Sequence, residues 1–203
     1  AFNQEYMLKP HRQSDALIFE EWIQIERYDV PSLLRGSRYE LAWSVDAAVS
    51  EKTSADYWAC IVMLKDLDTN KKYVIHHFRT KGSMDEMCSK IHDVQNMFKD
   101  WGLPPLIMEN VAQMGYLIQT LEKHWGVRVK RIPRINSKFG RLYDATPALS
   151  RGEVYFLPEQ QIIIDELLNF DPSGKSGNDD LTDCFADCIH ALDKVAGYKY
   201  GSL

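Results

Sequence analysis

The sequence of 203 residues predicts an α/β fold built on one mixed sheet. Three antiparallel strands come first, and parallel βα units flanked by helices follow. Residues 39–46, 57–64 and 73–78 are apolar, strand-like segments joined by short connections. After Ser83 the apolar residues recur at helical spacing instead. Short apolar runs then alternate with helical segments, which is typical of parallel βα units.

The first three strands predict an antiparallel meander. Residues 39–46 are strand-like, and residues 57–64 are apolar on both faces, which indicates a central strand. The segment Asp68-Thr69-Asn70-Lys71 has the residue types of a tight turn and leads to the third strand. Consecutive strands with such short connections pair in antiparallel fashion.

The rest of the chain follows from helix signals and short strands. Ser83 is a predicted N-cap, and Gly102 and Gly126 are predicted helix ends. In the helix that Pro158 begins, we expect four side chains to point inward: Ile162, Ile163, Leu167 and Leu168. The predicted elements are a helix over 84–101, a strand over 106–109, a helix over 114–125, a strand over 127–132, a helix over 138–150, a strand over 154–156, a helix from Pro158 and a last helix from Asp179-Asp180.

This order, β-β-β-α-β-α-β and then helices, is the ribonuclease H-like arrangement. The ends of its first and fourth strands are neighbours in the sheet. We expect residues 36–203 to form this domain and residues 1–35 to be a linker or N-terminal extension with a short helix. The first residue is Ala, and the opening residues resemble an internal segment of a protein. We therefore expect the chain to be a fragment of a larger protein.

The composition is that of a globular protein, with 45% hydrophobic residues and a formal net charge of −5. No apolar run approaches the length of a membrane span and no signal peptide is visible, so we expect a soluble intracellular protein without a membrane partner. The cysteines Cys60, Cys88, Cys184 and Cys188 lack zinc-site spacing and are expected to be reduced core thiols.

Acidic residues stand where apolar runs end or a helix begins. Asp46 closes the first strand, Glu109 closes the fourth, and Asp179-Asp180 opens the last helix. Carboxylates that converge repel one another unless they are protonated or bind cations. Divalent ions that prefer oxygen ligands would fill such a cluster. The pattern therefore favours metal-assisted phosphoryl chemistry.

Each acid also has a simpler interpretation. Asp46 and Asp56 could begin turns, and Glu109 could lie at a helix start for the sake of the helix dipole. Asp180 and Asp183, with Asp187, share one helix face and repel one another. A bound cation, or a Lys or Arg partner, would remove that penalty.

Basic residues cluster between residues 126 and 143 with no acidic residue among them: Arg128, Lys130, Arg131, Arg134, Lys138 and Arg141. A local excess of positive charge suits a phosphate backbone even where the total charge is negative. A solvated basic loop is the alternative.

Short motifs along nearly the whole chain resemble the C-terminal nuclease domain of the large terminase subunit of tailed double-stranded DNA phages. Their order and spacing carry the resemblance more than any single motif. The motifs are Phe2-Asn3-Gln4-Glu5-Tyr6, Ser44-Val45-Asp46-Ala47-Ala48, Ser54-Ala55-Asp56-Tyr57, Met108-Glu109-Asn110, Ser137-Lys138-Phe139-Gly140-Arg141, Gly152-Glu153-Val154-Tyr155-Phe156 and Asn178-Asp179-Asp180-Leu181-Thr182-Asp183.

The resemblance implies an endonuclease that uses two ions, Mg²⁺ or Mn²⁺, with Asp46, Glu109 and Asp180 at the core acid positions. Asp179 and Asp183 belong to the same motif, and Asp56 matches an accessory acid. Lys138 and Arg141 match a basic element beside the DNA. Asn178 stands where many relatives carry His.

The resemblance also implies the biological setting. Such a domain cuts concatemeric double-stranded DNA during genome packaging, at the procapsid in the host cell cytoplasm. Its partners are the ATPase domain of the same full-length protein, the portal and the small terminase subunit. Backbone contacts carry no sequence information, so cutting should be largely non-specific. A resolvase or transposase-like nuclease of the same fold, and a non-catalytic nucleic-acid-binding module, remain alternatives.

Overall fold

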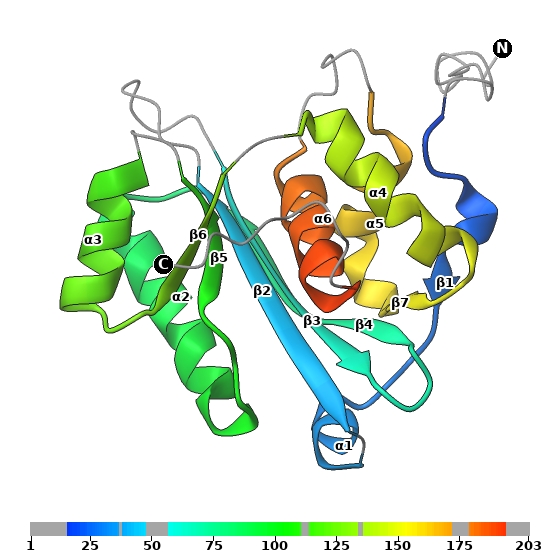
Figure 1. Ribbon diagram of the computed structural model, residues 1–203, viewed down its shortest axis with the longest axis horizontal. Helices are drawn as coiled ribbons and strands as arrows, with labels where there is room; N and C mark the ends of the chain where they lie inside the picture. The colour runs from blue at the N-terminus through cyan, green and yellow to red at the C-terminus, as the bar shows by residue number, and fades with distance from the viewer. Residues whose placement is uncertain are drawn as a thin grey trace, which may run out of the picture.

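A computed structural model describes residues 16–36, 38–47, 57–110, 114–133, 136–171 and 179–193. These residues form one mixed seven-stranded sheet in the order β1-β7-β4-β3-β2-β5-β6 (Figure 1). The strands are β1 (Gln24–Ile25), β2 (Tyr39–Ala47), β3 (Trp58–Asp66), β4 (Lys72–Thr80), β5 (Leu106–Glu109), β6 (Val129–Ile132) and β7 (Val154–Phe156). The predicted ribonuclease H-like sheet is thereby confirmed.

The middle of the sheet is the predicted antiparallel meander. β3 pairs with β2 on one side and with β4 on the other, and its residues 58–64 are all buried. The prediction of a central strand is confirmed, since both faces of β3 are covered. β5 pairs in parallel with β2 and with β6, so the first and fourth strands of the predicted scheme are neighbours.

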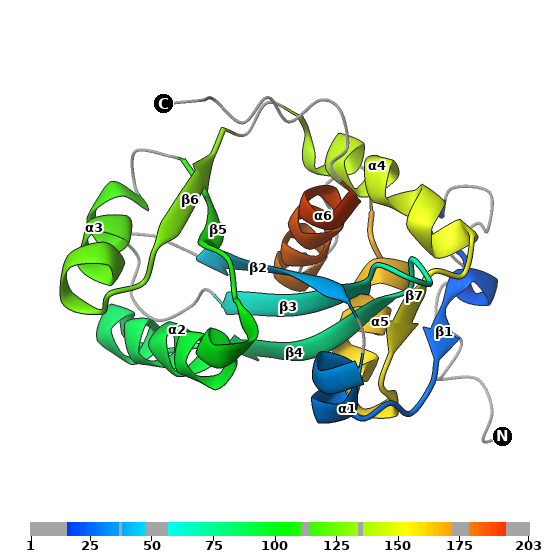
Figure 2. The ribbon, with the colours of Figure 1, turned by 60° about the horizontal axis from the view of Figure 1, so that its bottom comes forward.

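Helices cover both faces of the sheet and divide the core in two (Figures 1 and 2). Side chains alternate along β2, so Trp43 packs in one core and Ala42 in the other. One core contains α2 (Met84–Phe98) and α3 (Gly115–His124), and the other contains α4 (Lys138–Ser150), α5 (Gln161–Leu168) and α6 (Asp180–Asp193). A further short helix, α1 (Val30–Gly36), precedes β2.

The predicted N-cap Ser83 and the predicted helix stops Gly102 and Gly126 are confirmed. The Ser83 hydroxyl accepts the Glu86 backbone N–H at 3.4 Å, and the Glu86 carboxylate accepts the Ser83 N–H at 2.7 Å. Gly102 and Gly126 have φ angles of 76° and 65°, a left-handed conformation that glycine adopts without a Cβ clash. Both glycines stop a helix where the sequence predicts.

One inward-facing prediction in α5 is wrong. Ile162 is 39% exposed, whereas Ile163, Ile164 and Leu167 are buried. Three consecutive apolar residues span more than the buried face of a helix, so one of them must point outward. The predicted helix from Pro158 is a short 3₁₀ turn over Pro158–Gln160 followed by α5, and Ile162 lies on the solvent side of α5.

Part of the segment before residue 36 belongs to the sheet. β1 pairs in parallel with β7, with Gln24 opposite Tyr155. The Tyr28 hydroxyl donates to the Val74 carbonyl oxygen at 2.7 Å, and Ile18 is buried. The domain boundary at residue 36 stays a prediction. Residues 24–28 contact the main sheet, which agrees with the expectation that this segment could dock on the main body.

The four cysteines are free and buried, which confirms the prediction of core thiols. Burial raises the pKa of the Cys184 and Cys188 thiols well above their ordinary value, so both stay protonated. Within the described part of the chain, no helix combines the length and apolar character needed to cross a bilayer.

A charge cluster joins the C-terminal end of α6 to the sheet and predicts acid sensitivity. Buried Lys72 pairs with Glu153 at 3.0 Å and with Asp193 at 3.1 Å. Hydrogen bonds from Arg151, and then from Lys72, lower the pKa of Glu153 from 4.5 to about 2. A lowered folded-state pKa stabilises the fold above pH 4.5, and this contribution is lost as the pH falls towards about 2.

We therefore expect the free energy of unfolding to fall more steeply between pH 4.5 and 2 in the wild type than in Glu153→Gln. Urea unfolding followed by circular dichroism at several pH values would measure this. Glu21→Gln, which changes an exposed Glu, is the matched control and should keep the wild-type slope. If the free energy of unfolding falls equally steeply with pH in the wild type and in Glu153→Gln, Glu153 is not the source of the acid sensitivity.

Candidate active site

Asp46 and Glu109 lie on neighbouring parallel strands at the same level. Ser44 of β2 is in register with Ile107 of β5, and both acids come two residues later on their strands. Residues two apart point to the same face of a sheet. The Ser44 hydroxyl donates to the Asp187 carboxylate of α6 at 3.0 Å, so this is the face that α6 covers. The sequence-predicted pairing of these two strand ends is thus present.

The backbone of Asp46 is fixed by the first turns of α6. Its N–H donates to the Cys184 sulfur at 3.1 Å, and the Cys184 thiol donates to the Ala59 carbonyl oxygen at 3.5 Å. The sequence indicates only a core thiol at Cys184, and sequence reasoning missed this contact. The start of α6 therefore lies over β2 and β3, beside the predicted catalytic acid (Figures 1 and 2).

Arg79 lies on β4, on the side of Asp46 that is away from Glu109, and its side chain approaches Asp180. Ala59 of β3 is in register with both Asp46 and Arg79, so Asp46 and Arg79 share the face under α6. The Nε atom of Arg79 lies 3.8 Å from the Asp180 carboxylate. Burial raises the pKa of Asp180, and the positive charge of Arg79 opposes that rise.

Glu166 of α5 connects Arg79 to the backbone of α6. Its carboxylate accepts the Leu181 N–H at 3.0 Å, which satisfies one of the unpaired donors at the start of a helix. The same carboxylate lies 3.1 Å from Nη1 of Arg79, and the ring of Tyr57 packs on the guanidinium at 4.0 Å. Neither Arg79 nor Glu166 has a local sequence signal, so sequence reasoning missed both.

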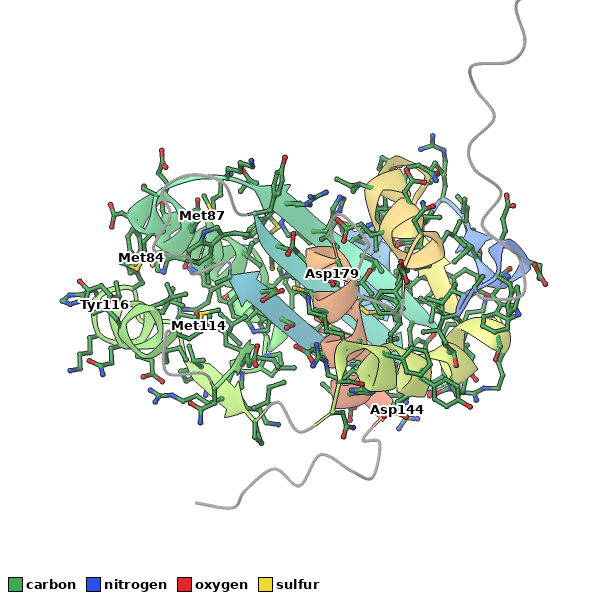
Figure 3. All side chains as sticks on the ribbon, turned by 90° about the horizontal axis from the view of Figure 1, so that it is seen from above. Met84, Met87, Met114, Tyr116, Asp144 and Asp179 are labelled. Carbon is green, nitrogen blue, oxygen red and sulfur yellow. The ribbon has the colours of Figure 1, made fainter. Side chains whose placement is uncertain are left out.

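Two further acids of the last motif are held by basic side chains of α4. The Lys138 ammonium lies 2.8 Å from the Asp179 carboxylate and 2.9 Å from the Asp183 carboxylate. Arg141 pairs with the other oxygen of Asp183. Figure 3 shows Asp179 beside the first turn of α6. Burial alone would lower the pKa of Lys138, but Asp183 and Asp179 raise it above its ordinary value.

The sequence left two kinds of partner open for the acids of the last helix, a bound cation or a Lys or Arg side chain. The structure shows Lys and Arg side chains beside these acids. Asp183 is 4% exposed, and its repulsion by neighbouring carboxylates is offset by Lys138 and Arg141. Arg141 stays a predicted DNA contact, but its side chain is 3% exposed and faces Asp183.

The other predicted DNA contacts stay predictions. Arg128 and Arg131 are exposed and Lys130 is half-buried, on or beside edge strand β6. Arg131 forms an exposed ion pair of 3.0 Å with Glu122 of α3, an acidic neighbour that the sequence order does not reveal. Arg134 and Asp56 lie outside the described residues.

The site matches a divalent metal in its chemistry but not yet in its geometry. Carboxylate oxygens suit Mg²⁺ and Mn²⁺, and Asp46 and Glu109 carry two such groups at equivalent positions of neighbouring strands. In the segments that the structure describes, however, no three His, Cys, Asp or Glu side chains are grouped closely enough to hold an ion. The acids at the start of α6 (Asp179, Asp180 and Asp183) are instead directed to Arg79, Lys138 and Arg141.

The strand order, the parallel pairing of β2 with β5 and the covering helix α6 define a ribonuclease H-like fold. No family model matches the sequence, and no curated protein matches it either. Solved structures do match.

The nuclease domain of the Thermus phage P74-26 large terminase matches over 88% of this chain and 96% of its own length, with 18% identity and a TM-score of 0.58. The g2p nuclease domain of bacteriophage SPP1 with bound Mn matches over 84% and 97%, with 14% identity and a TM-score of 0.57. A longer large terminase from a thermophilic bacteriophage matches over 87% of this chain, which spans 44% of that protein, with 9% identity and a TM-score of 0.63. At these identities the likeness establishes the fold.

Proposed function

We propose that the protein is a metal-dependent endonuclease, the nuclease domain of a large terminase that cuts concatemeric double-stranded DNA during phage genome packaging. The observation that carries the proposal is the register that brings Asp46 and Glu109 level on neighbouring strands beneath the start of α6. Two carboxylates at adjacent strand ends suit a site for hard cations and phosphate.

In this proposal Asp46 and Glu109 would hold the metal from the sheet, and Asp180 would hold it from α6. Two Mg²⁺ or Mn²⁺ ions, when bound, supply an activated water and neutralise the leaving 3′ oxygen. Cys184 and Glu166 fix the backbone at Asp46 and Leu181, so the strand acid and the helix start keep their positions. Asp56, Asp179 and Asp183 are proposed as accessory acids. The bound Mn of the SPP1 domain supports a divalent ion.

Basic side chains would bind the DNA backbone between β6 and α4. The proposed contacts are Arg128, Lys130, Arg131, Arg134 and Lys138. Arg and Lys contacts to phosphates position a duplex without distinguishing its sequence. Cutting should therefore be largely independent of sequence and weaken as salt is added.

The remaining partners follow from the likeness to a longer terminase. Because this chain spans 44% of the longer large terminase described above, we propose an ATPase domain in the same full-length protein. The portal and the small terminase subunit are the further proposed partners, and the host cytoplasm at the procapsid is the proposed location.

A plasmid assay tests the proposed activity. Incubation of supercoiled plasmid with the protein and Mn²⁺ or Mg²⁺ is expected to yield nicked, linear and then fragmented DNA, and EDTA should stop the reaction. Plasmid that is bound but never nicked, at any metal concentration, would contradict the proposal and favour a non-catalytic nucleic-acid-binding module.

Choice of substrate separates the proposal from a resolvase or a transposase-like enzyme. Linear duplexes without a junction or a terminal recognition sequence are expected to be cut as fast as four-way junctions of the same length. A strong preference for the junction, or for one terminal sequence, would favour the alternative enzymes.

A further inference from the structure

Three cationic side chains neutralise the acids at the start of α6, and they differ in how freely they can leave. The side chains of Arg141 and Arg79 are 3% and 10% exposed, whereas that of Lys138 is 40% exposed. Arg141 and Arg79 are thus enclosed by the fold. Lys138 can exchange its partners for solvent ions without unpacking a core.

The helix start of α4 does not depend on the Lys138 side chain. Lys138 is the first residue of α4, and the Ser137 hydroxyl accepts the Gly140 N–H at 3.1 Å as an N-cap. The cap fixes the backbone of the helix start without involving the ammonium group. A flexible four-carbon stem then carries the charge between the Asp179 and Asp183 carboxylates.

The Lys138 ammonium occupies the space that a cation shared by Asp179 and Asp183 would need. With Lys138 and Arg141 present, the two carboxylates are matched by two positive charges. Without Lys138, the two carboxylates lose one of these positive charges, and the more negative pair attracts a divalent ion more strongly.

We propose that Lys138 is an internal counter-cation that competes with divalent metal for Asp179 and Asp183, and that it must leave before metal can bind on the α6 side of the site. The inference rests on the proposed function for the metal. A backbone phosphate that pairs with the ammonium group would release both carboxylates, so DNA arrival and metal binding would strengthen each other.

Mn²⁺ binding to the protein without DNA, measured by titration calorimetry, tests the competition. Lys138→Met, which keeps the length of the side chain and removes its charge, is expected to bind Mn²⁺ about three- to tenfold more tightly than the wild type. Lys138→Arg should bind like the wild type. Lys123→Met, on α3 at the opposite flank of the molecule (Figure 1), controls for net charge and should change little.

An unchanged or weaker affinity of Lys138→Met would overturn the inference. Nuclease assays on the same samples separate the two ideas. If the wild type cuts plasmid with Mn²⁺ but Lys138→Met binds Mn²⁺ no more tightly than the wild type does, the counter-cation role of Lys138 is wrong and the proposed function stands. If no variant binds Mn²⁺ or cuts, both fail.

Amine labelling of the wild type gives a second test that needs no variant. Mg²⁺ is expected to increase the rate at which an amine-reactive reagent modifies Lys138, measured by mass spectrometry of tryptic peptides, because the ammonium leaves its two carboxylates. The rate at exposed Lys123 should not change. Labelling of Lys138 that is indifferent to saturating Mg²⁺ would contradict the competition.

Discussion

Replacement of Asp46 by Asn is expected to lower the rate of DNA cutting at least about a thousandfold, because it removes one strand-borne charge from the proposed metal site. The fold should survive. Asn has the shape of Asp, and the N–H of residue 46 can still donate to the Cys184 sulfur. Asp46 is half-buried at the end of β2, so the change leaves no cavity in either core.

Plasmid cleavage with Mn²⁺ under single-turnover conditions measures this loss, and far-UV circular dichroism with a melting curve checks the fold. Asp93→Asn, an exposed change on α2, is the matched control and should cut at the wild-type rate. A rate for Asp46→Asn within about threefold of the wild type would remove Asp46 from the proposed chemistry.

Replacement of Arg141 by Met is expected to destabilise the fold by about 3 kcal/mol, because it takes a buried cationic partner from the buried Asp183 carboxylate. The value lies at the low end for a broken buried ion pair, since Lys138 still contacts Asp183. The loss should fall mainly on the packing of α4 against α6, because this ion pair joins the two helices.

Urea unfolding of Arg141→Met measures the cost. The double variant Arg141→Met with Asp183→Leu is the informative control, because it removes both charges and fills the space with apolar atoms. It should recover most of the lost stability. If Arg141→Met costs less than about 1 kcal/mol, Asp183 is not an uncompensated buried charge in that variant, and the structural role given to Arg141 is wrong.

The two variants separate chemistry from architecture within one short region. Asp46→Asn should lose activity and keep stability, whereas Arg141→Met should lose stability first. This contrast matters because the sequence pattern predicts Arg141 beside DNA, while its side chain lies inside the fold.

Local patterns in the sequence are sufficient for most of the elements from residue 39 onward and for the neighbouring strands that carry Asp46 and Glu109. Alternation and apolar runs predict β2 to β5, and Ser83, Gly102 and Gly126 predict helix ends, because periodicity and capping act between residues close in the chain. The order of elements then implies that β2 and β5 are neighbours, which puts Asp46 and Glu109 at the same sheet end.

Only the tertiary structure decided which charges neutralise the acids of the last helix. Arg79 meets Asp180 from β4, Glu166 caps α6 from α5, and Lys138 bridges Asp179 and Asp183 from α4. The spacing of residues along the chain does not predict such pairs. They form because helices packed on one sheet face bring side chains from distant segments together in a space with little water, where each buried charge needs a partner.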